Sequence, residues 1–431
     1  MEQVDFIVKC GWVVPGAGMQ PLRDGAVAVQ GDCIKAVGRA EHVLEKYLSS
    51  GIVERPSGMV VPGLFNTHTH IPMTLFRGLA DDLPLKRWLE DHIFPAEARL
   101  TPEHVKLGAE LACAEMIRCG VTSFIDMYLF EDVIAGVVDR AGLRAWLGEG
   151  LFDFPSPAFD SGFDALEATS RMMEKWSGHE RITITVDPHT PYTCSPELLS
   201  AAARLADEQT AIIKIHVAET EWENSEIQRR HGRSPVALLD DLGLLGERTV
   251  MAHCVCLSES DMDLMAARGV SVSHCPESNL KLASGIAPVP AMLERKINVT
   301  LGTDGAASNN DLDILGEMDC AAKIHKGIAH DPVVVSAPDV LAMVTSNAAA
   351  AVGRADLGII APGAKADMAI LDLDAPHMRP CLNPVSQLVY SARGGDVVDL
   401  VVNGSFIMEN RKILTLDEKE IFDRVEKMVS E

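Results

Sequence analysis

The stretch Met59–His70, MVVPGLFNTHTH, places His68 and His70 two positions apart, directly after an apolar run. Side chains two positions apart in a strand lie on the same face, about 7 Å apart at the backbone, so both imidazole rings can point toward one metal ion. A pair of surface or core histidines would give the same local pattern. The rest of the chain has to decide between these two interpretations.

The region that follows, from about Val60 to Val352, alternates short apolar segments with longer amphipathic stretches. Alternation of strand and helix along a chain predicts a parallel sheet covered by helices. This number of units is most simply accommodated by a closed, eight-stranded (β/α)8 barrel. The expected strands include VTSFIDM (121–127), ITITVDPH (182–189), AIIKIHVAE (211–219), TVMAHCV (249–255), VSVSHCP (270–276) and INVTLGTD (297–304).

Both ends of the chain differ from this central region. Short β-rich segments separated by Gly and Pro precede residue 59, and strand signals return after about residue 355, with a hairpin expected around Asn403-Gly404 and a charged helix at the end. We therefore expect residues 60–355 to form the barrel. Residues 1–59 and 356–431 are expected to share one small sheet domain.

The composition limits the classes of partner. The 431 residues include 62 acidic and 38 basic side chains, which gives a formal net charge of -24. Such a surface repels nucleic acid and anionic membranes, so neither is an expected partner. The N-terminus lacks the layout of a secretory signal, no apolar run reaches membrane-spanning length, and the ten cysteines form no CxxC pair. A protein of the reducing cytoplasm is the simplest expectation, and a homo-oligomer is left open.

Four more polar side chains fall at or just after the ends of expected strands: His216, Glu219, His253 and Asp304. The C-terminal strand ends of a parallel barrel open onto one face, so these residues and the first histidine pair are expected to meet there. Histidines and a carboxylate suit a first-row divalent metal, with zinc the commonest choice and one position left open for water. Burying such groups without partners would be costly, so the pattern favours a metal site.

Longer motifs around these positions resemble the amidohydrolase superfamily and, within it, the 5-methylthioadenosine/S-adenosylhomocysteine deaminase family. The resemblance implies a distorted (β/α)8 barrel with a single metal ion and a small β-sandwich domain built from both chain ends. The fourth expected strand ends in TVDPH rather than in the bridging lysine of two-metal members, which also favours one metal. The resemblance covers essentially the whole chain and rests on VPGLFNTHTHIPMTLFRGLADDLPLKRWL (61–89), PHTPYTCSPELL (188–199), IHVAET (215–220), AHCVCL (252–257), SHCPESNLKLASGIAPV (273–289) and TLGTDGAASNN (300–310).

The resemblance also implies a role for each site residue. The implied metal ligands are His68, His70, His216 and Asp304. The implied catalytic groups are Glu219 as the proton shuttle, with His253 and Asp304 beside the bound water. The implied substrate contacts are Glu97, through the ribose hydroxyls, together with His189, Glu219 and Asp304.

The implied activity is the hydrolytic deamination of an adenine nucleoside (5′-methylthioadenosine, 5′-deoxyadenosine, adenosine or S-adenosylhomocysteine) to the inosine analogue and ammonia. A metal lowers the pKa of bound water from about 15.7 toward 7, so hydroxide can attack C6 of the adenine while a carboxylic acid protonates the ring. One alternative is a hydrolase of another nitrogen heterocycle, such as guanine, cytosine, a pterin or a triazine. The other is a non-catalytic barrel protein. Glu97 and the segment PHTPYTCSPELL favour the nucleoside.

The segment after the expected third strand bears on the 5′ end of the substrate. Related deaminases that take S-adenosylhomocysteine place arginines there, whereas residues 145–170 contain no Arg or Lys, and Glu149 stands at one of those positions. Glu149 and its acidic neighbours would also repel a substrate carboxylate. We therefore expect nucleosides with a neutral 5′ end to be preferred. The alternative is that Arg77, Arg87 or a neighbouring subunit supplies the contact.

Two further polar residues have no assigned role. Lys214 shares a strand face with His216 by the period of two, and His274 ends another expected strand. For His274, a place in the pocket and a purely structural place are equally compatible with the sequence.

Overall fold

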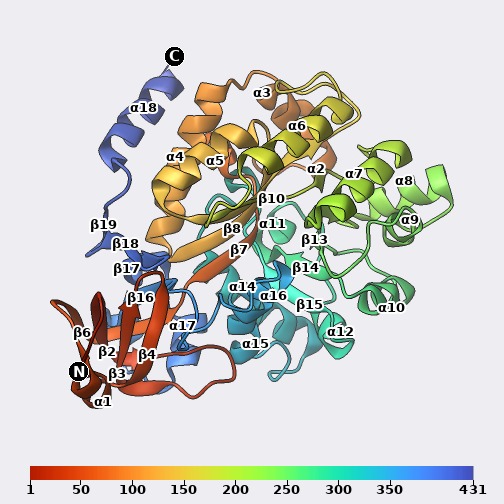
Figure 1. The fold of residues 1–431 in the computed structure, drawn as a ribbon. Helices are drawn as coiled ribbons and strands as arrows, with labels where there is room; N and C mark the ends of the chain where they lie inside the picture. Colours follow the sequence, from red (N-terminus) through yellow and green to blue (C-terminus); the bar gives the residue numbers. More distant parts are fainter. Residues whose placement is uncertain (431) are drawn as a thin grey trace.

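A closed barrel of parallel strands lies beside a separate sheet in the computed structural model, which describes residues 1–430 (Figure 1). The barrel strands form two hydrogen-bonded runs, in the orders β10-β9-β8-β7 and β12-β13-β14-β15, with β11 paired to β9. A parallel bridge between Val186 and Ile213 joins the runs on one side. On the other side, the Asp304 amide donates to the His68 carbonyl (2.9 Å). The bounds are β7 (Leu64–Thr69), β8 (Val121–Tyr128), β9 (Arg144–Leu151), β10 (Ile182–Ile184), β11 (Asp187–Pro188), β12 (Ile213–Val217), β13 (Thr249–His253), β14 (Ser271–His274) and β15 (Asn298–Leu301).

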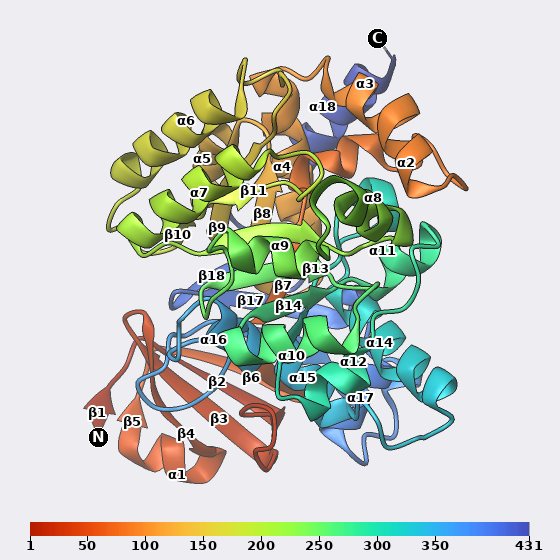
Figure 2. The ribbon, with the colours of Figure 1, turned by 90° about the vertical axis from the view of Figure 1, so that its right-hand side faces the viewer.

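The barrel strands are buried on both faces, which explains their nearly continuous apolar sequences. Every residue of β12, IKIHV, and of β13, TVMAH, is buried. Helices connect these strands and lie around them (Figure 2). Their bounds are α4 (Pro102–Arg118), α5 (Glu131–Ala141), α6 (Gly162–Lys175), α7 (Pro196–Gln209), α8 (Glu221–His231), α9 (Pro235–Asp241), α10 (Glu259–Arg268), α11 (Pro276–Lys281), α12 (Val289–Glu294), α13 (Ala306–Asn309), α14 (Ile314–Ala329), α15 (Ala337–Met343) and α16 (Ser346–Ala351).

A set of short helical turns follows β7 directly and supplies part of the wall of the cavity described below. These turns carry Pro72, Pro84 and Pro95, which limit the length of regular helix because proline lacks a backbone donor. Their bounds are η1 (Ile71–Phe76), α2 (Leu85–Trp88), η2 (Leu89–Ile93) and α3 (Phe94–Glu97).

The second sheet confirms the expectation that both chain ends build one sheet. Its strand order is β19-β18-β17-β16-β6-β2-β3-β4, so N-terminal and C-terminal strands meet where β16 pairs antiparallel with β6. Asn403 (φ +50°) and Gly404 (φ +74°) form the expected hairpin turn between β17 and β18. The bounds are β2 (Phe6–Val13), β3 (Leu22–Gln30), β4 (Cys33–Arg39), β6 (Gly51–Pro62), β16 (Met368–Asp372), β17 (Val397–Val402), β18 (Ser405–Glu409) and β19 (Lys412–Ile413).

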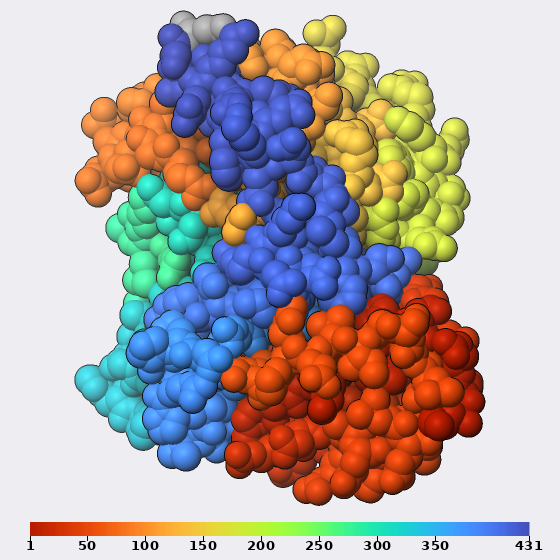
Figure 3. Space-filling model, turned by 90° about the vertical axis from the view of Figure 1, so that its left-hand side faces the viewer, coloured from red at the N-terminus to blue at the C-terminus, as the bar shows by residue number. Residues whose placement is uncertain are grey.

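The remaining elements lie at the periphery. The short strands β1 (Glu2–Gln3) and β5 (Tyr47–Leu48) pair with each other, with α1 (Ala40–Lys46) just before β5. After α17 (Pro384–Tyr390) and the last strands, the expected C-terminal helix is α18 (Glu418–Ser430). Figure 3 shows the C-terminal residues (blue) running from beside the N-terminal residues (red) up across the barrel. The domain boundaries at residues 59 and 355 stay a prediction.

A buried ion pair connects the barrel to the sheet. The guanidinium of Arg144, in β9, donates to both carboxylate oxygens of Asp367, just before β16 (3.0 and 3.3 Å). The side chains are only 1% and 3% exposed. This pair therefore ties the two parts of the molecule together through groups that water does not reach.

One strand was placed wrongly by the sequence analysis. Residues 145–151 were assigned to the segment after the third strand, but Arg144–Leu151 is itself the third barrel strand, β9. Gly148 and Gly150 weaken the apolar pattern there. The reason for Gly148 is tertiary, since a Cβ at this position would lie 2.1 Å from the carboxyl carbon of Asp187.

Among residues 1–430, no helix combines the length and the apolar character needed to cross a bilayer.

Candidate active site

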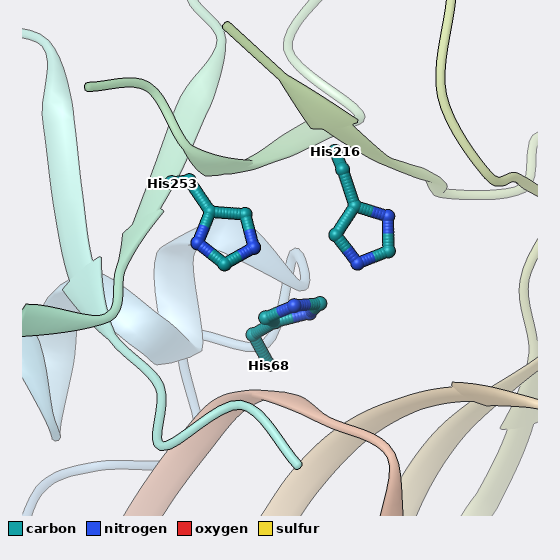
Figure 4. A group of neighbouring side chains, drawn as sticks. All are labelled: His68, His216 and His253. Carbon is teal, nitrogen blue, oxygen red and sulfur yellow. The ribbon is translucent and has the colours of Figure 1, made fainter. Parts of the chain in front are cut away.

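Four side chains converge at the C-terminal ends of the barrel strands. His68 lies in β7, His70 directly follows it, His216 lies in β12, and Asp304 follows β15 by three residues. The Nε2 atoms of His70 and His216 are 3.2 Å apart. Asp304 Oδ1 lies 3.4 Å from His68 Nε2 and 3.3 Å from His70 Nε2. The ring of His253, which ends β13, is centred 5.1 Å from that of His68, and Figure 4 shows the rings of His68, His216 and His253 facing a common space.

Hydrogen bonds on the far side of three rings fix their orientation. Nδ1 of His70 donates to the Met127 carbonyl (2.5 Å), and Nδ1 of His216 donates to the His189 carbonyl (2.8 Å). A carbonyl can only accept, so Nδ1 carries a proton in both rings and Nε2 is the nitrogen directed at the centre. Nδ1 of His253 similarly donates to Asn279 Oδ1 (3.0 Å).

The donor set fits one divalent metal ion. The Nε2 atoms of His70 and His216 face each other at 3.2 Å, a spacing that requires either a proton or a metal cation between the two nitrogens. Tetrahedral ligands about 2.0 to 2.1 Å from a metal lie roughly 3.3 Å from one another, which matches the spacings of 3.2 to 3.4 Å here. Both ring nitrogens of buried His68 also lack a hydrogen-bond partner among the described residues. Burial holds the pKa of His68 and of His216 well below its usual range, so both rings are neutral, as ligation requires.

Backbone strain accompanies these side chains. Asp304, His253 and Cys254 have φ values of +65°, +70° and +50°, in the left-handed region that non-glycine residues rarely adopt. Asp304 is held there by three hydrogen bonds, one donated to Oδ1 by the Gly305 amide (2.8 Å), and two to Oδ2 by the hydroxyls of Ser278 (2.7 Å) and Ser308 (3.0 Å). These donors occupy the carboxylate on one side and leave Oδ1 directed at the histidines.

Glu219 lies beside this cluster. Its Oε2 is 3.9 Å from Nε2 of His253, and its Oε1 accepts a hydrogen bond from the Ser284 hydroxyl (3.2 Å). Burial raises the pKa of Glu219 above its ordinary value. This shift favours the protonated form of the carboxyl group, which can deliver its proton to a ligand in the cavity.

Glu223, in the first turn of α8, holds the backbone that presents Glu219. Its Oε1 accepts from the Ala218 amide (2.9 Å) and its Oε2 from the Glu219 amide (3.0 Å). Ala218 is itself left-handed, with φ +51°. Glu223 is 1% exposed, so its carboxylate serves this turn rather than the solvent. Glu223 is not among the residues predicted from the sequence, although its position four residues after Glu219, at the start of a helix, is a usable signal.

A cavity of about 680 Å³ opens above the cluster. Among the described residues, its lining contains no Lys or Arg. The predicted site residues in its wall are His70, Glu97, His189, His216, Glu219, His253 and Asp304; apolar and aromatic residues that also line it include Trp88, Phe94, Tyr128, Leu129, Phe152 and Leu282. His68 lies beneath, fully buried.

The two residues expected at the ribose lie on opposite segments of this wall. Glu97 ends α3, and burial raises its pKa to about 7. His189 follows β11; its Nδ1 lies 3.0 Å from the Thr193 hydroxyl, and burial lowers its pKa to about 3, so the ring is a neutral hydrogen-bonding group. Both have the polarity needed to bind hydroxyl groups.

Lys214 and His274, whose roles the sequence left open, lie outside the cavity lining. Lys214 is fully buried in the barrel interior, where its Nζ donates to the Ile125 carbonyl (3.4 Å). His274 packs behind the site, with its Nε2 3.0 Å from Nε2 of His325 in α14. This position favours the structural interpretation of His274 over a place in the pocket.

The residues invoked for the 5′ end of the substrate also lie elsewhere. Glu149 does not line the cavity; its carboxylate accepts from the amides of Phe130 (3.0 Å) and Glu131 (2.8 Å) at the start of α5. Arg77 pairs with Glu115, and Arg87 pairs with Asp91 on an exposed helix surface. The idea that Glu149 would repel a substrate carboxylate is therefore wrong, because its side chain points away from the substrate cavity.

Comparison with known proteins places this geometry in a family. Residues 59–407 match the model of the Amidohydrolase family. The chain is 49% identical to 5-methylthioadenosine/S-adenosylhomocysteine deaminase from Syntrophobacter fumaroxidans, over 93% of this chain and 92% of the relative. It is 45% identical to 5′-deoxyadenosine deaminase from Methanothermobacter thermautotrophicus, over 95% of each. A zinc-bound adenosine deaminase from Xanthomonas campestris superimposes with a TM-score of 0.97 at 37% identity, over 100% of this chain and 98% of the other. The convergent histidines, the buried carboxylates and these similarities together show that the chain belongs to the amidohydrolase family.

Proposed function

We propose that the protein is a metal-dependent hydrolase that releases ammonia from C6 of adenine nucleosides. The observation that carries this proposal is the placement of a buried carboxyl group, Glu219, beside a cluster of His and Asp side chains with metal-ligand spacing, in one cavity. Deaminase relatives that act on adenine nucleosides support the substrate class. Ammonia release from a panel of nucleosides and bases tests this proposal against the guanine, cytosine, pterin and triazine alternatives.

In this proposal His68, His70, His216 and Asp304 hold one divalent metal, with zinc as the first choice. A bound metal of this kind supplies Lewis acidity that makes water a nucleophile at neutral pH. His253 and Asp304 take up the proton that the water loses and pass it to the departing ammonia.

Glu219 supplies the second proton movement. Attack at C6 places negative charge on the ring nitrogen, and the carboxyl group of Glu219 protonates it there. Its raised pKa suits this role, because the group must carry a proton before the reaction begins. Glu97 and His189 orient the nucleoside through its ribose.

The 5′ end forms a finer part of the proposal. Since the described cavity lining contains no Lys or Arg, we propose that 5′-methylthioadenosine, 5′-deoxyadenosine and adenosine are deaminated more efficiently than S-adenosylhomocysteine. A missing charge-assisted hydrogen bond of about 1.5 to 3 kcal/mol corresponds to about 10- to 100-fold in kcat/KM.

Two variants test the assignment of roles. Glu219→Gln keeps the size of the side chain and removes its proton, so ammonia release should fall by at least about 100-fold while metal content stays at about one ion per chain. His68→Ala should instead lose the metal. Ammonia release by Glu219→Gln near the parental rate would show that another residue protonates the ring, and full activity in rigorously metal-free protein would overturn the proposal.

A further inference from the structure

A second cavity adjoins the catalytic one. It measures about 1290 Å³ with its open mouth and lies between the turns after β7, the start of α8 and the end of α11. We call it the outer cavity. It shares five lining residues with the catalytic cavity, so the two cavities are adjacent: Leu85, Leu89, Phe94, Tyr192 and Leu282.

Two of the shared lining residues lie close in the chain to the residues proposed to bind the ribose. Phe94 begins α3, the helix that Glu97 ends, and Tyr192 follows His189 by three residues. Both aromatic residues line both cavities. A nucleoside with its base at the metal cluster and its ribose between Glu97 and His189 therefore has the outer cavity next to its sugar. The substituent on the 5′ carbon is the part of the substrate that can extend into it.

The walls of the outer cavity are mainly apolar. Leu83, Pro84 and Trp222 line it, in addition to the shared residues. Trp222 packs edge-to-face on Tyr192, with ring centroids 5.2 Å apart, and its side chain is 40% exposed, which leaves ring surface available to a ligand.

The two lysines of the outer cavity are already engaged. Lys86 Nζ lies 4.8 Å from the Trp222 ring centre and 3.8 Å from a carboxylate oxygen of Glu90. Lys281 Nζ lies 2.6 Å from Asp81. Each cation thus already lies beside a carboxylate, which offsets its attraction for a substrate carboxylate, so the walls favour an apolar substituent over a charged one.

We propose that the outer cavity binds an apolar 5′ substituent, an alkyl or aryl thioether, and that Trp222 determines specificity for it. This inference rests on the proposed function, because it requires an adenine nucleoside in the catalytic cavity. It predicts activity on nucleosides with substituents larger than the methylthio group.

A series of substrates tests the inference with the zinc-loaded enzyme. We expect kcat/KM to rise from 5′-deoxyadenosine through the 5′-methylthio to the 5′-butylthio and 5′-benzylthio nucleosides, by about fourfold for each buried methylene and mainly through KM. Trp222→Ala should lower kcat/KM for the butylthio and benzylthio substrates by about tenfold, with 5′-deoxyadenosine changed less than about twofold. Phe163→Ala is the matched control, since Phe163 is an exposed aromatic residue on α6 outside both cavities and should change none of these values.

The outcomes separate the two proposals. Equal kcat/KM values for all nucleosides of the series, with normal turnover of 5′-deoxyadenosine, would show that the outer cavity is not a subsite. The proposed function would then still stand. A greater gain for S-adenosylhomocysteine than for the butylthio nucleoside would overturn the apolar class of ligand. Absence of ammonia release from every nucleoside would overturn both proposals.

Discussion

Two buried glutamates hold the same kind of turn at two barrel strand ends. Glu223 accepts the amides of Ala218 and Glu219, and Glu149 accepts the amides of Phe130 and Glu131. In each turn the first of the two amides belongs to a left-handed residue, Ala218 (φ +51°) or Phe130 (φ +59°). Such a conformation costs about 1 to 2 kcal/mol, and the two hydrogen bonds that the amides donate to one carboxylate offset this cost. One of these turns presents the proposed proton donor and the other does not, so they form a natural pair for comparison.

Glu223→Gln should lower catalysis selectively. An amide accepts through one oxygen only and turns its own N–H groups toward a backbone donor, so the turn that carries Glu219 shifts. We expect kcat to fall about 10- to 100-fold, with KM changed less than about threefold and the metal content unchanged. Steady-state kinetics and metal analysis of the folded protein check this outcome.

Glu149→Gln is the control for Glu223→Gln. It removes a carboxylate that accepts two backbone amides and that is as deeply buried as Glu223. Both variants should therefore destabilise the protein by about 1 to 3 kcal/mol, but Glu149→Gln should leave kcat near the parental value. Equal losses of kcat in the two variants would mean that Glu223 serves general stability and not the placement of Glu219.

The sequence predicted individual site residues unevenly. His68, His70, His216, His253 and Asp304 could be predicted because each stands at the end of an apolar strand, a pattern that is local in the chain. The groups that orient them could not. The bond from His253 to Asn279, for example, depends on how the end of β13 approaches helix α11, which no local pattern encodes.

At the scale of elements, β14 and α14 are joined by a pair of neutral histidines. His274 and His325 lie with their Nε2 atoms 3.0 Å apart, and both are buried. Burial lowers the pKa of His325 to about 4 and that of His274 well below its usual range. Two neutral rings can share one hydrogen bond, whereas protonating both would place two like charges in the protein interior.

This pair should make the stability of the protein sensitive to acid. Between pH 6.5 and about 4, the unfolded chain binds a proton at residue 325 that the folded protein does not, so the free energy of unfolding falls as the pH falls. His325→Gln should reduce the decrease in the free energy of unfolding between pH 7 and pH 5 by about 1 to 2 kcal/mol. Denaturation midpoints of zinc-saturated protein at both pH values measure it. His330→Asn, at the exposed end of the same helix, should leave the pH dependence unchanged.

Elements with uninterrupted apolar patterns were correctly predicted, as β8, β12, β13 and β15 show. Strand β9 was displaced because its glycines and Glu149 make it resemble a loop. Gly148 leaves space for the Asp187 carboxylate, and Glu149 accepts hydrogen bonds from a neighbouring turn. Tertiary contacts therefore explain why these two residues, which are unusual in a buried strand, occur in β9.

At the scale of the whole molecule, the buried ion pair Arg144–Asp367 should strongly stabilise the contact between the barrel and the second sheet. Arg144→Met would leave Asp367 buried without its cation, at a cost of about 3 to 5 kcal/mol, and should lower the thermal midpoint by several degrees. Adding Asp367→Asn keeps an oxygen for the Asn403 amide, which now donates to Asp367 (2.7 Å), and should recover much of the loss.

An exposed pair provides the reference for this prediction. Arg171 and Glu167 pair on the surface of α6 with side chains 59% and 72% exposed, so Arg171→Met should change the midpoint little. If Arg144→Met lowered the thermal midpoint as little as Arg171→Met, the buried pair would not hold the barrel and the sheet together.

The overall architecture was the most predictable level, because alternating strands and helices restrict the chain to few topologies. The contribution of both chain ends to one sheet was predicted from composition and turn signals. The order of strands within that sheet could not be predicted, since it depends on which edges remain free after the barrel closes.

The central position of β6 in that sheet has a consequence for how each copy is made. During translation β6 leaves the ribosome with its partner β2 already synthesised, but the whole barrel must be made before its other partner, β16, emerges. For that interval the nascent sheet has an open edge of unpaired amides and carbonyls, which is the kind of surface that pairs with other chains. The molecule is therefore most exposed to misassembly before its last strands appear, and arrival of β16 ends that exposure.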